Sequence, residues 1–149
     1  MKVSKIIATA AIALATLSQS AHAKDSTDMK NQKIVMKFYQ ELFGDKDVSA
    51  IDRYLTEDYI QHNPSVADGR EPLKAAASQW FRGAAKEKVD IQHVASQGGI
   101  VFLHVRSKNE SGGVQAIVDI FRVKNGKIAE HWDVIQDAPA TSANPHPMF

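Results

Sequence analysis

Residues 116–136 read AIVDIFRVKNGKIAEHWDVIQ, and this stretch decides the fold. Two runs rich in β-branched and aromatic residues flank Asn125-Gly126, the strongest short-range signal for a β-hairpin. The ionisable residues Asp119, His131 and Asp133 interrupt these otherwise apolar strands. Because burying an unpartnered carboxylate is costly, a sheet that carries two of them is expected to use them.

The loop of this hairpin has two possible lengths, which place Asp119 differently. A two-residue type I′ loop at Asn125-Gly126 sets Asp119 opposite Trp132, whereas a three-residue loop over 124–126 with a bulge at Gly126 sets Asp119 opposite His131. Only the bulged loop gathers the polar side chains on one face. We therefore predict the bulged loop, with Asp119, His131 and Asp133 facing one pocket.

The other face of the same hairpin is then apolar. It carries Val118, Ile120, Trp132 and Val134. A monomer rarely exposes such a band to water, so we expect a second subunit to cover it in a homodimer.

The N-terminus resembles a secretory signal peptide. Lys2 and Lys5 precede an apolar run over 6–17, and Ala21-His22-Ala23 matches the small-x-small cleavage pattern. The run is too short for a transmembrane helix, which needs about 20 residues. We expect cleavage near Ala23, an exported (periplasmic or secreted) mature chain, and no membrane attachment afterwards.

Length, charge and cysteine content restrict the mature chain further. It would have 126 residues, enough for one domain, and the absence of cysteine excludes disulfides and a lipidated cysteine. It would carry 16 basic against 17 acidic residues without a basic stripe, which argues against nucleic-acid partners. A small molecule is the expected partner.

Three helices are predicted before the strands. Apolar residues recur at helical spacing over about 28–43, then in a short helix that starts near Asp47, and in a third helix over about 71–82. Between the last two, His62-Asn63-Pro64 marks a turn, because the residue before a proline leaves the helical region.

Beyond Gly83 the period changes from 3.6 to 2. Residues 88–95 alternate, with Val89, Ile91, His93 and Ala95 on one face, and residues 100–107 place Val101, Leu103 and Val105 opposite Phe102, His104 and Arg106. Helices followed by strands predict an α+β fold, in which three N-terminal helices pack on a curved antiparallel sheet of at least four strands. Residues 137–149, with three prolines, are predicted to form a C-terminal tail outside a domain over 24–136.

The segments YIQHNP (59–64) and VDIFRVKNGKIAEHWDV (118–134), with the helical start, resemble the SnoaL-like polyketide cyclase family. This resemblance implies the cone-shaped fold of the nuclear-transport-factor-2-like and ketosteroid isomerase-like superfamily, often dimeric through the sheet. In the characterised cyclases an aspartate on the last strand is the acid/base of an aldol closure, and Asp133 falls at that position. A histidine on the preceding strand of those enzymes is replaced here by Asp119.

The residues themselves suit proton abstraction next to a carbonyl group. A carboxylate in an apolar pocket is a candidate base, and two neighbouring carboxylates separate into one acid and one base. The predicted catalytic residues are Asp133, Asp119, His131 and His62, with His62 at the mouth as donor to the substrate oxygen. The predicted substrate-binding residues are His104, Trp80, Phe102, Phe121 and Tyr59.

Several alternatives stay open from the residues alone. Asp133 is a hydrogen-bonded structural residue at a strand end, or Asp119 forms a structural ion pair with His131 or Arg122. His62 is a turn residue, and His93 and His104 are core or surface histidines. As a whole, the pocket holds a small ligand without catalysis. A metal site is not predicted, and no cofactor is expected, because no His-x-x-x-His pair is present and His131 with Asp133 supply only two ligands. The leading function is an exported acid–base lyase, isomerase or cyclase.

Overall fold

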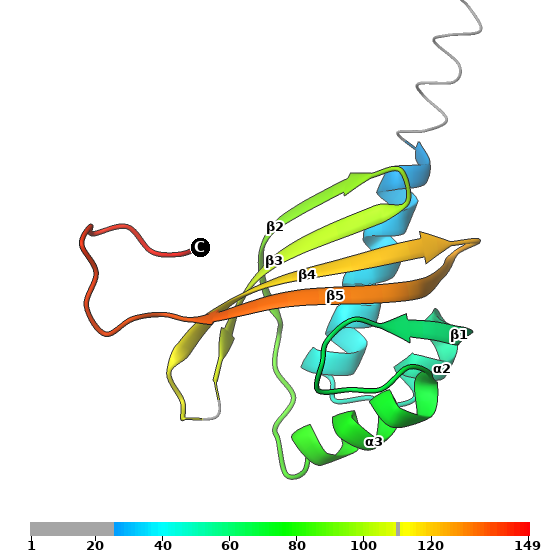
Figure 1. Ribbon diagram of the computed structural model, residues 1–149, viewed down its shortest axis with the longest axis horizontal. Helices are drawn as coiled ribbons and strands as arrows, with labels where there is room; N and C mark the ends of the chain where they lie inside the picture. The colour runs from blue at the N-terminus through cyan, green and yellow to red at the C-terminus, as the bar shows by residue number, and fades with distance from the viewer. Residues whose placement is uncertain (1–25, 110) are drawn as a thin grey trace, which may run out of the picture.

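The computed structural model describes residues 26–109 and 111–149 (Figure 1). The predicted signal peptide lies outside the described residues. Within the described part of the chain, no helix has the length and apolar character that crossing a membrane requires.

The helices precede most of the sheet in the chain, as predicted. A helix over residues 26–39 runs into a π-helical turn, η1 (Gln40–Gly44), and is followed by α2 (Ala50–Tyr54) and α3 (Arg70–Trp80). The strands are β1 (Leu55–Gln61), β2 (Asp90–Gln97), β3 (Ile100–Lys108), β4 (Val114–Lys124) and β5 (Lys127–Asp137). The first predicted helix thus differs only in its final π turn.

The sheet has five strands in the order β1-β5-β4-β3-β2, and the α+β prediction is confirmed. Strands β2 to β5 form the expected antiparallel meander, while β1 pairs with β5 in parallel at the edge (Figure 1). We did not predict β1, because Glu57 and Asp58 interrupt its apolar pattern and its only partner lies about seventy residues away. Such charged side chains are typical of an edge strand.

The hairpin loop is the two-residue type, so the predicted bulged loop is wrong. Asn125 and Gly126 both have positive φ (52° and 75°), as a type I′ turn requires, and Val123 pairs with Ile128. The bulge lies further along, where Ala129 is the extra residue of β5 between the pairs Val123–Ile128 and Arg122–Glu130.

Because of the bulge at Ala129, the side chains of β5 lie on the predicted faces, although their pairing with β4 differs from the prediction. Asp119 pairs with Asp133 and Phe121 with His131, whereas we had predicted Asp119 opposite His131. Without the extra residue, charged Glu130 would face Phe121 in the core. The bulge at Ala129 keeps Glu130 outside and turns His131 and Asp133 inward.

A second bulge changes the prediction for β2. Ile91 pairs with Val105 and His93 with His104, so Gln92 is the extra residue. Val94, rather than His93, then packs against the core, while His93 is exposed. The predicted common face of Ile91 and His93 is therefore wrong.

The core lies between the helices and the inner face of the sheet. Its fully buried large side chains are Leu42, Ile51, Leu55, Leu103, Ile128, Val35 and Val101. On the outer face, Phe102, Val118 and Val134 are exposed. The tail beyond Asp137 has no helix or strand, and its last residue, Phe149, packs against the His104 ring (centroids 6.2 Å apart) and under the Arg106 guanidinium (5.6 Å).

Candidate active site

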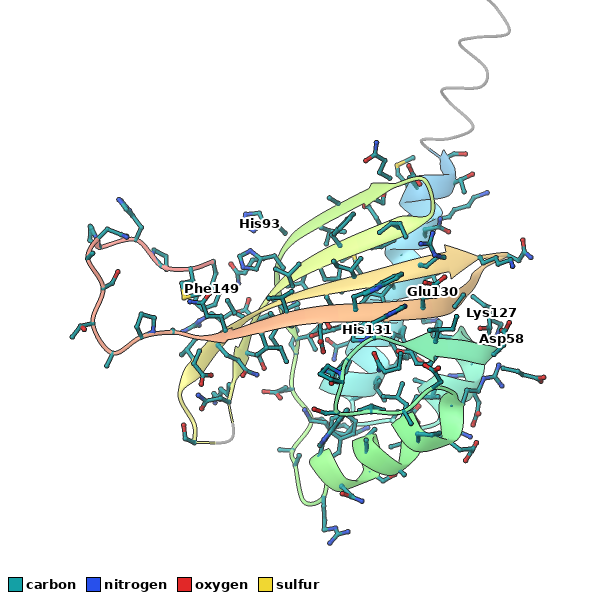
Figure 2. All side chains as sticks on the ribbon, viewed as in Figure 1. Asp58, His93, Lys127, Glu130, His131 and Phe149 are labelled. Carbon is teal, nitrogen blue, oxygen red and sulfur yellow. The ribbon has the colours of Figure 1, made fainter. Side chains whose placement is uncertain are left out.

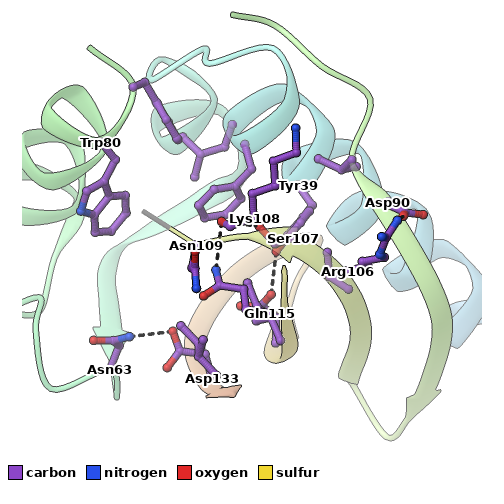
Figure 3. Close-up of a pocket in the computed structure, with 18 of the residues that line it drawn as sticks. Tyr39, Asn63, Trp80, Asp90, Arg106, Ser107, Lys108, Asn109, Gln115 and Asp133 are labelled. Atoms are coloured by element: carbon purple, nitrogen blue, oxygen red, sulfur yellow. Dashed lines mark hydrogen bonds and ion pairs between the residues drawn. The ribbon is translucent and has the colours of Figure 1, made fainter. Parts of the chain in front are cut away.

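A cavity of about 1000 Å³ opens between the helices and the inner face of the sheet (Figure 3). Aromatic and aliphatic side chains line most of it, among them Phe38, Phe43, Leu73, Phe81 and Val105. Asp119, His131 and Asp133 form a polar patch in this wall. One ligand atom from each lies within 4.8 Å of the others.

Asp119 is the most buried member of this patch, with only 4% of its surface exposed. Its Oδ1 lies 2.9 Å from Nε2 of His131, and its Oδ2 accepts a hydrogen bond of 2.8 Å from the Tyr39 hydroxyl. Polar contacts to both oxygens offset the cost of burying such a group. Asp119 is thus held on both sides.

Tyr39 reaches this carboxylate from the first helix, 80 residues away in the chain. Burial, followed by the negative charge of Asp119, raises the pKa of the Tyr39 hydroxyl well above its ordinary value of 10.0. Tyr39 therefore remains a hydrogen-bond donor over the whole neutral range. Sequence analysis placed it only in the apolar stripe of that helix.

The orientation of His131 is set by Gln61 at the end of β1. The backbone N–H of Asn63 donates to Gln61 Oε1 (3.0 Å), which identifies that atom as the amide oxygen. His131 Nδ1 lies 2.8 Å from the same oxygen and therefore carries a proton. The remaining nitrogen, Nε2, faces Asp119 Oδ1.

Asp133 differs from Asp119 in being only half-buried and in having no ion pair within residues 26–109 and 111–149. The Asn63 side chain donates to its Oδ2 over 2.6 Å (Figure 3). In the described part of the chain its other oxygen, Oδ1, has no hydrogen-bond partner. Asp133 thus presents this oxygen to the cavity, whose lining is part apolar and part polar or charged.

Tyr59 supplies a hydroxyl to the same cavity. Its oxygen accepts a hydrogen bond from the Gln61 side chain (3.1 Å), which leaves its own hydrogen for a ligand. Burial, then the charges of Asp119 and Asp133, raises the pKa of Tyr59, so the hydroxyl stays protonated.

The structure brings together most of the residues predicted for the site. Asp119, His131, Asp133, Tyr59, Trp80 and Phe121 all line the cavity. Trp80 is at the end of α3 with 51% of its surface exposed, at the edge of the cavity.

Three predicted residues lie elsewhere. His62 does not line the cavity, because its ring stacks on Trp132 (centroids 4.4 Å apart) and its Nε2 lies 3.5 Å from Glu130 Oε2. Phe102 and His104 do not line it either. They alternate with the buried residues of β3 and so occupy the outer face.

Sequence analysis missed Gln61 and Asn63 as well as Tyr39. Both flank His62 in the segment YIQHNP, so the motif was recognised but the wrong side chain was chosen. A strand alternates its faces, and Gln61 points inward because Tyr59 does. Recognising β1 as a strand would have corrected the choice.

Known structures share this fold at low sequence identity. TsrD from Streptomyces laurentii is 21% identical (TM-score 0.60), with 72% of this chain and 88% of TsrD covered. An NTF-2-like protein of unknown function from Burkholderia xenovorans LB400 is 16% identical (TM-score 0.61), with coverages of 77% and 89%. The likeness to these structures establishes the nuclear-transport-factor-2-like fold.

A comparison with curated protein sequences found no match. The family model described as SnoaL-like polyketide cyclase matches residues 33–143, which include every residue of the polar patch and its partners. The chain belongs to the SnoaL-like polyketide cyclase family.

Proposed function

We propose that this protein is an acid–base lyase, isomerase or cyclase that removes a proton next to the carbonyl group of a small apolar molecule. The observation that carries the proposal is that Asp133 lines the cavity with its Oδ1 free of any hydrogen-bond partner among the described residues. A base for a carbon acid needs a carboxylate with one oxygen free to reach the substrate.

The proposed step uses two groups of the cavity wall, Asp133 on β5 and Tyr59 on the neighbouring strand β1. Asp133 Oδ1 takes the α-proton and forms an O–H bond, while the electron pair of the broken C–H bond moves to the carbonyl oxygen. Tyr59 donates a hydrogen bond to the resulting enolate oxygen, the role we had first predicted for His62. The enolate then closes a ring, eliminates a group or takes back the proton at another carbon.

The remaining polar residues position these two. Asn63 holds Asp133 through its Oδ2, and Gln61 links Tyr59 to His131. The Asp119–His131 pair belongs to the same polar patch as Asp133 and is a suitable store for the abstracted proton. In this proposal Asn63 and Gln61 are positioning groups, and the Asp119–His131 pair is a relay group.

Deuterium exchange at the α-carbon tests this proposal. The protein in D₂O is mixed with a panel of small ketones, enones and cyclic carbonyl compounds, and exchange is followed by NMR. We expect wild type to exchange at least one compound and Asp133→Asn to lose about 10²-fold or more of that rate. Asp58→Asn, an exposed carboxylate on β1, is the matched control and keeps the wild-type rate.

A second candidate function is ligand binding without catalysis. The observation in its favour is that Asp119 is fully engaged by Tyr39 and His131, as a structural ion pair would be. Wild type would then be stabilised against heat by panel compounds without exchanging their protons. That result, or equal exchange in Asp133→Asn, would contradict the catalytic proposal.

We further propose that the protein acts after export, on the basis of residues 1–23. Cell fractionation followed by N-terminal sequencing is the direct test. A mature chain that starts at Lys24 outside the cytoplasm would support it, and an intact Met1 in the cytoplasm would contradict it.

A further inference from the structure

We propose that Asp119, His131 and Asp133 form a binding site for a divalent transition-metal ion, with Zn²⁺ as the best match. The three side chains offer one imidazole nitrogen and two carboxylate oxygens within 4.8 Å of one another, on the wall of an accessible cavity. The sequence suggested only two ligands on one strand. The register of the hairpin adds Asp119 as the third.

The distances suit a common ion. Two ligand atoms bound to a tetrahedral Zn²⁺ at about 2.1 Å lie about 3.4 Å apart. His131 Nε2 and Asp119 Oδ1 are 2.9 Å apart. All three ligand atoms lie within 4.8 Å of one another, so the widest separation needs to close by at most about 1.4 Å. Asp133, the half-buried member of the triad, is the side chain that would move.

The surroundings of the triad support the proposal independently of these distances. Each potential ligand is held through its far atom by a residue outside the triad: His131 Nδ1 by Gln61, Asp119 Oδ2 by Tyr39, and Asp133 Oδ2 by Asn63. Metal-binding histidines donate their second ring nitrogen in this manner, and metal-binding carboxylates are similarly braced. This bracing leaves one further atom of each side chain for a metal ion.

The charge balance also favours a cation. Tyr39 and Asn63 are neutral donors, and within the described residues no lysine or arginine is bonded to either carboxylate. Of the four cationic residues that line the cavity, Lys46 pairs with Glu87 and Arg106 with Asp90. The other two, Lys88 and Lys108, form no ion pair with either carboxylate of the triad among the described residues. Two closely spaced carboxylates beside one imidazole thus retain negative charge for a positive ligand.

The ligand set selects the class of ion. Imidazole favours zinc, iron, nickel and copper over magnesium and calcium, and the two carboxylates favour a harder ion than copper. Zn²⁺ accepts this mixed nitrogen and oxygen set. We therefore expect Mg²⁺ and Ca²⁺ in excess not to displace bound Zn²⁺.

Titration of the metal-free protein with ZnCl₂ against a chromophoric chelator tests the inference. We expect one Zn²⁺ per chain, and binding weakened at least tenfold by His131→Gln and by Asp133→Asn. Asn63→Ala retains all three ligands and is expected to weaken binding by about 10- to 100-fold through lost bracing. A melting curve without metal confirms that each variant is folded.

A pair of histidines outside the triad provides the control. His93 and His104 have Nδ1 atoms 3.2 Å apart, and they lie at the same end of the sheet as Phe149 (Figure 2). The double variant His93→Gln/His104→Gln is expected to bind Zn²⁺ as wild type does. The inference would be overturned if this double variant lost Zn²⁺ binding, if the triad variants bound Zn²⁺ as wild type does, or if wild type showed no saturable binding. No substrate is needed, so a failure of this inference can be told from a failure of the proposed catalysis. Zn²⁺ bound through Asp133 Oδ1 would occupy the oxygen proposed as the base, so we expect Zn²⁺ to inhibit the proton exchange.

Discussion

The two faces of the sheet carry the same kinds of residue in different settings. On the inner face, His131 and Asp119 are 10% and 6% exposed at their side chains and lie 2.9 Å apart. On the outer face, His62 and Glu130 are 39% and 23% exposed and 3.5 Å apart. Burial and bracing distinguish a candidate chemical site from an ordinary surface pair, because screening by water weakens the outer one.

Removal of one acid from each pair should show the largest difference between the faces. Asp119→Ala leaves the Tyr39 hydroxyl and His131 Nε2 buried without their acceptor, and we expect a loss of about 3–5 kcal/mol in the free energy of unfolding. Glu130→Ala removes a more exposed partner of His62 and Arg122 and is expected to cost about 1 kcal/mol or less. Urea denaturation measures the free energy of unfolding of both variants. Equal losses would contradict the difference between the inner and the outer pair.

Tyr39→Phe tests the same inner network more gently. It deletes one hydrogen bond to a charged acceptor, with an expected cost of about 1.5–3 kcal/mol at neutral pH. Because the folded-state pKa of Tyr39 is raised, its contribution is complete below the unfolded value near 10 and is lost as pH rises through the folded value.

The alkaline titration of wild type should show this dependence. The pKa values of Tyr39, Tyr54 and Tyr59 are all raised, so we expect tyrosinate absorbance to develop above pH 10 and together with unfolding. The same titration in urea should centre near pH 10. Ionisation of all three tyrosines at pH 10 in the folded protein would contradict the buried network.

The fluorescence of the two tryptophans reports separately on the two faces of the sheet. Trp80 lines the cavity, whereas Trp132 stacks on His62 at the outer face. We expect a cavity ligand to change the emission of Trp132→Phe, which retains Trp80, and to leave the emission of Trp80→Phe nearly unchanged. The reverse pattern would place the ligand on the outer face.

The smallest effect on folding is expected from Val134, which is 66% exposed on the outer face. We propose that a second copy of the chain covers this face, where Phe102 and Val118 are also exposed. Val134→Glu should then abolish dimers in sedimentation while changing the stability of the monomer by only about 0.5 kcal/mol. Ser78→Glu on α3 is the exposed control, and a monomeric wild type would contradict the proposal.

Sequence reasoning was most successful where local patterns decide the structure. The Asn-Gly turn, the alternation of the strands and the helical spacing before them predicted the α+β fold and the shared face of Asp119, His131 and Asp133. It failed at Ala129 and Gln92, where single bulges reset the register, because an extra residue leaves no distinct composition signal.

The sequence by itself therefore determined the fold class, the family and the hairpin that carries the acidic groups, since these depend on short-range periodicity and turn chemistry. Only the tertiary structure decided which partners those groups have. Tyr39 lies 80 residues from Asp119, Asn63 lies 70 from Asp133, and Gln61 lies 70 from His131. Such contacts arise when the first helix and the parallel edge strand β1 dock on the sheet, and no local pattern encodes that docking.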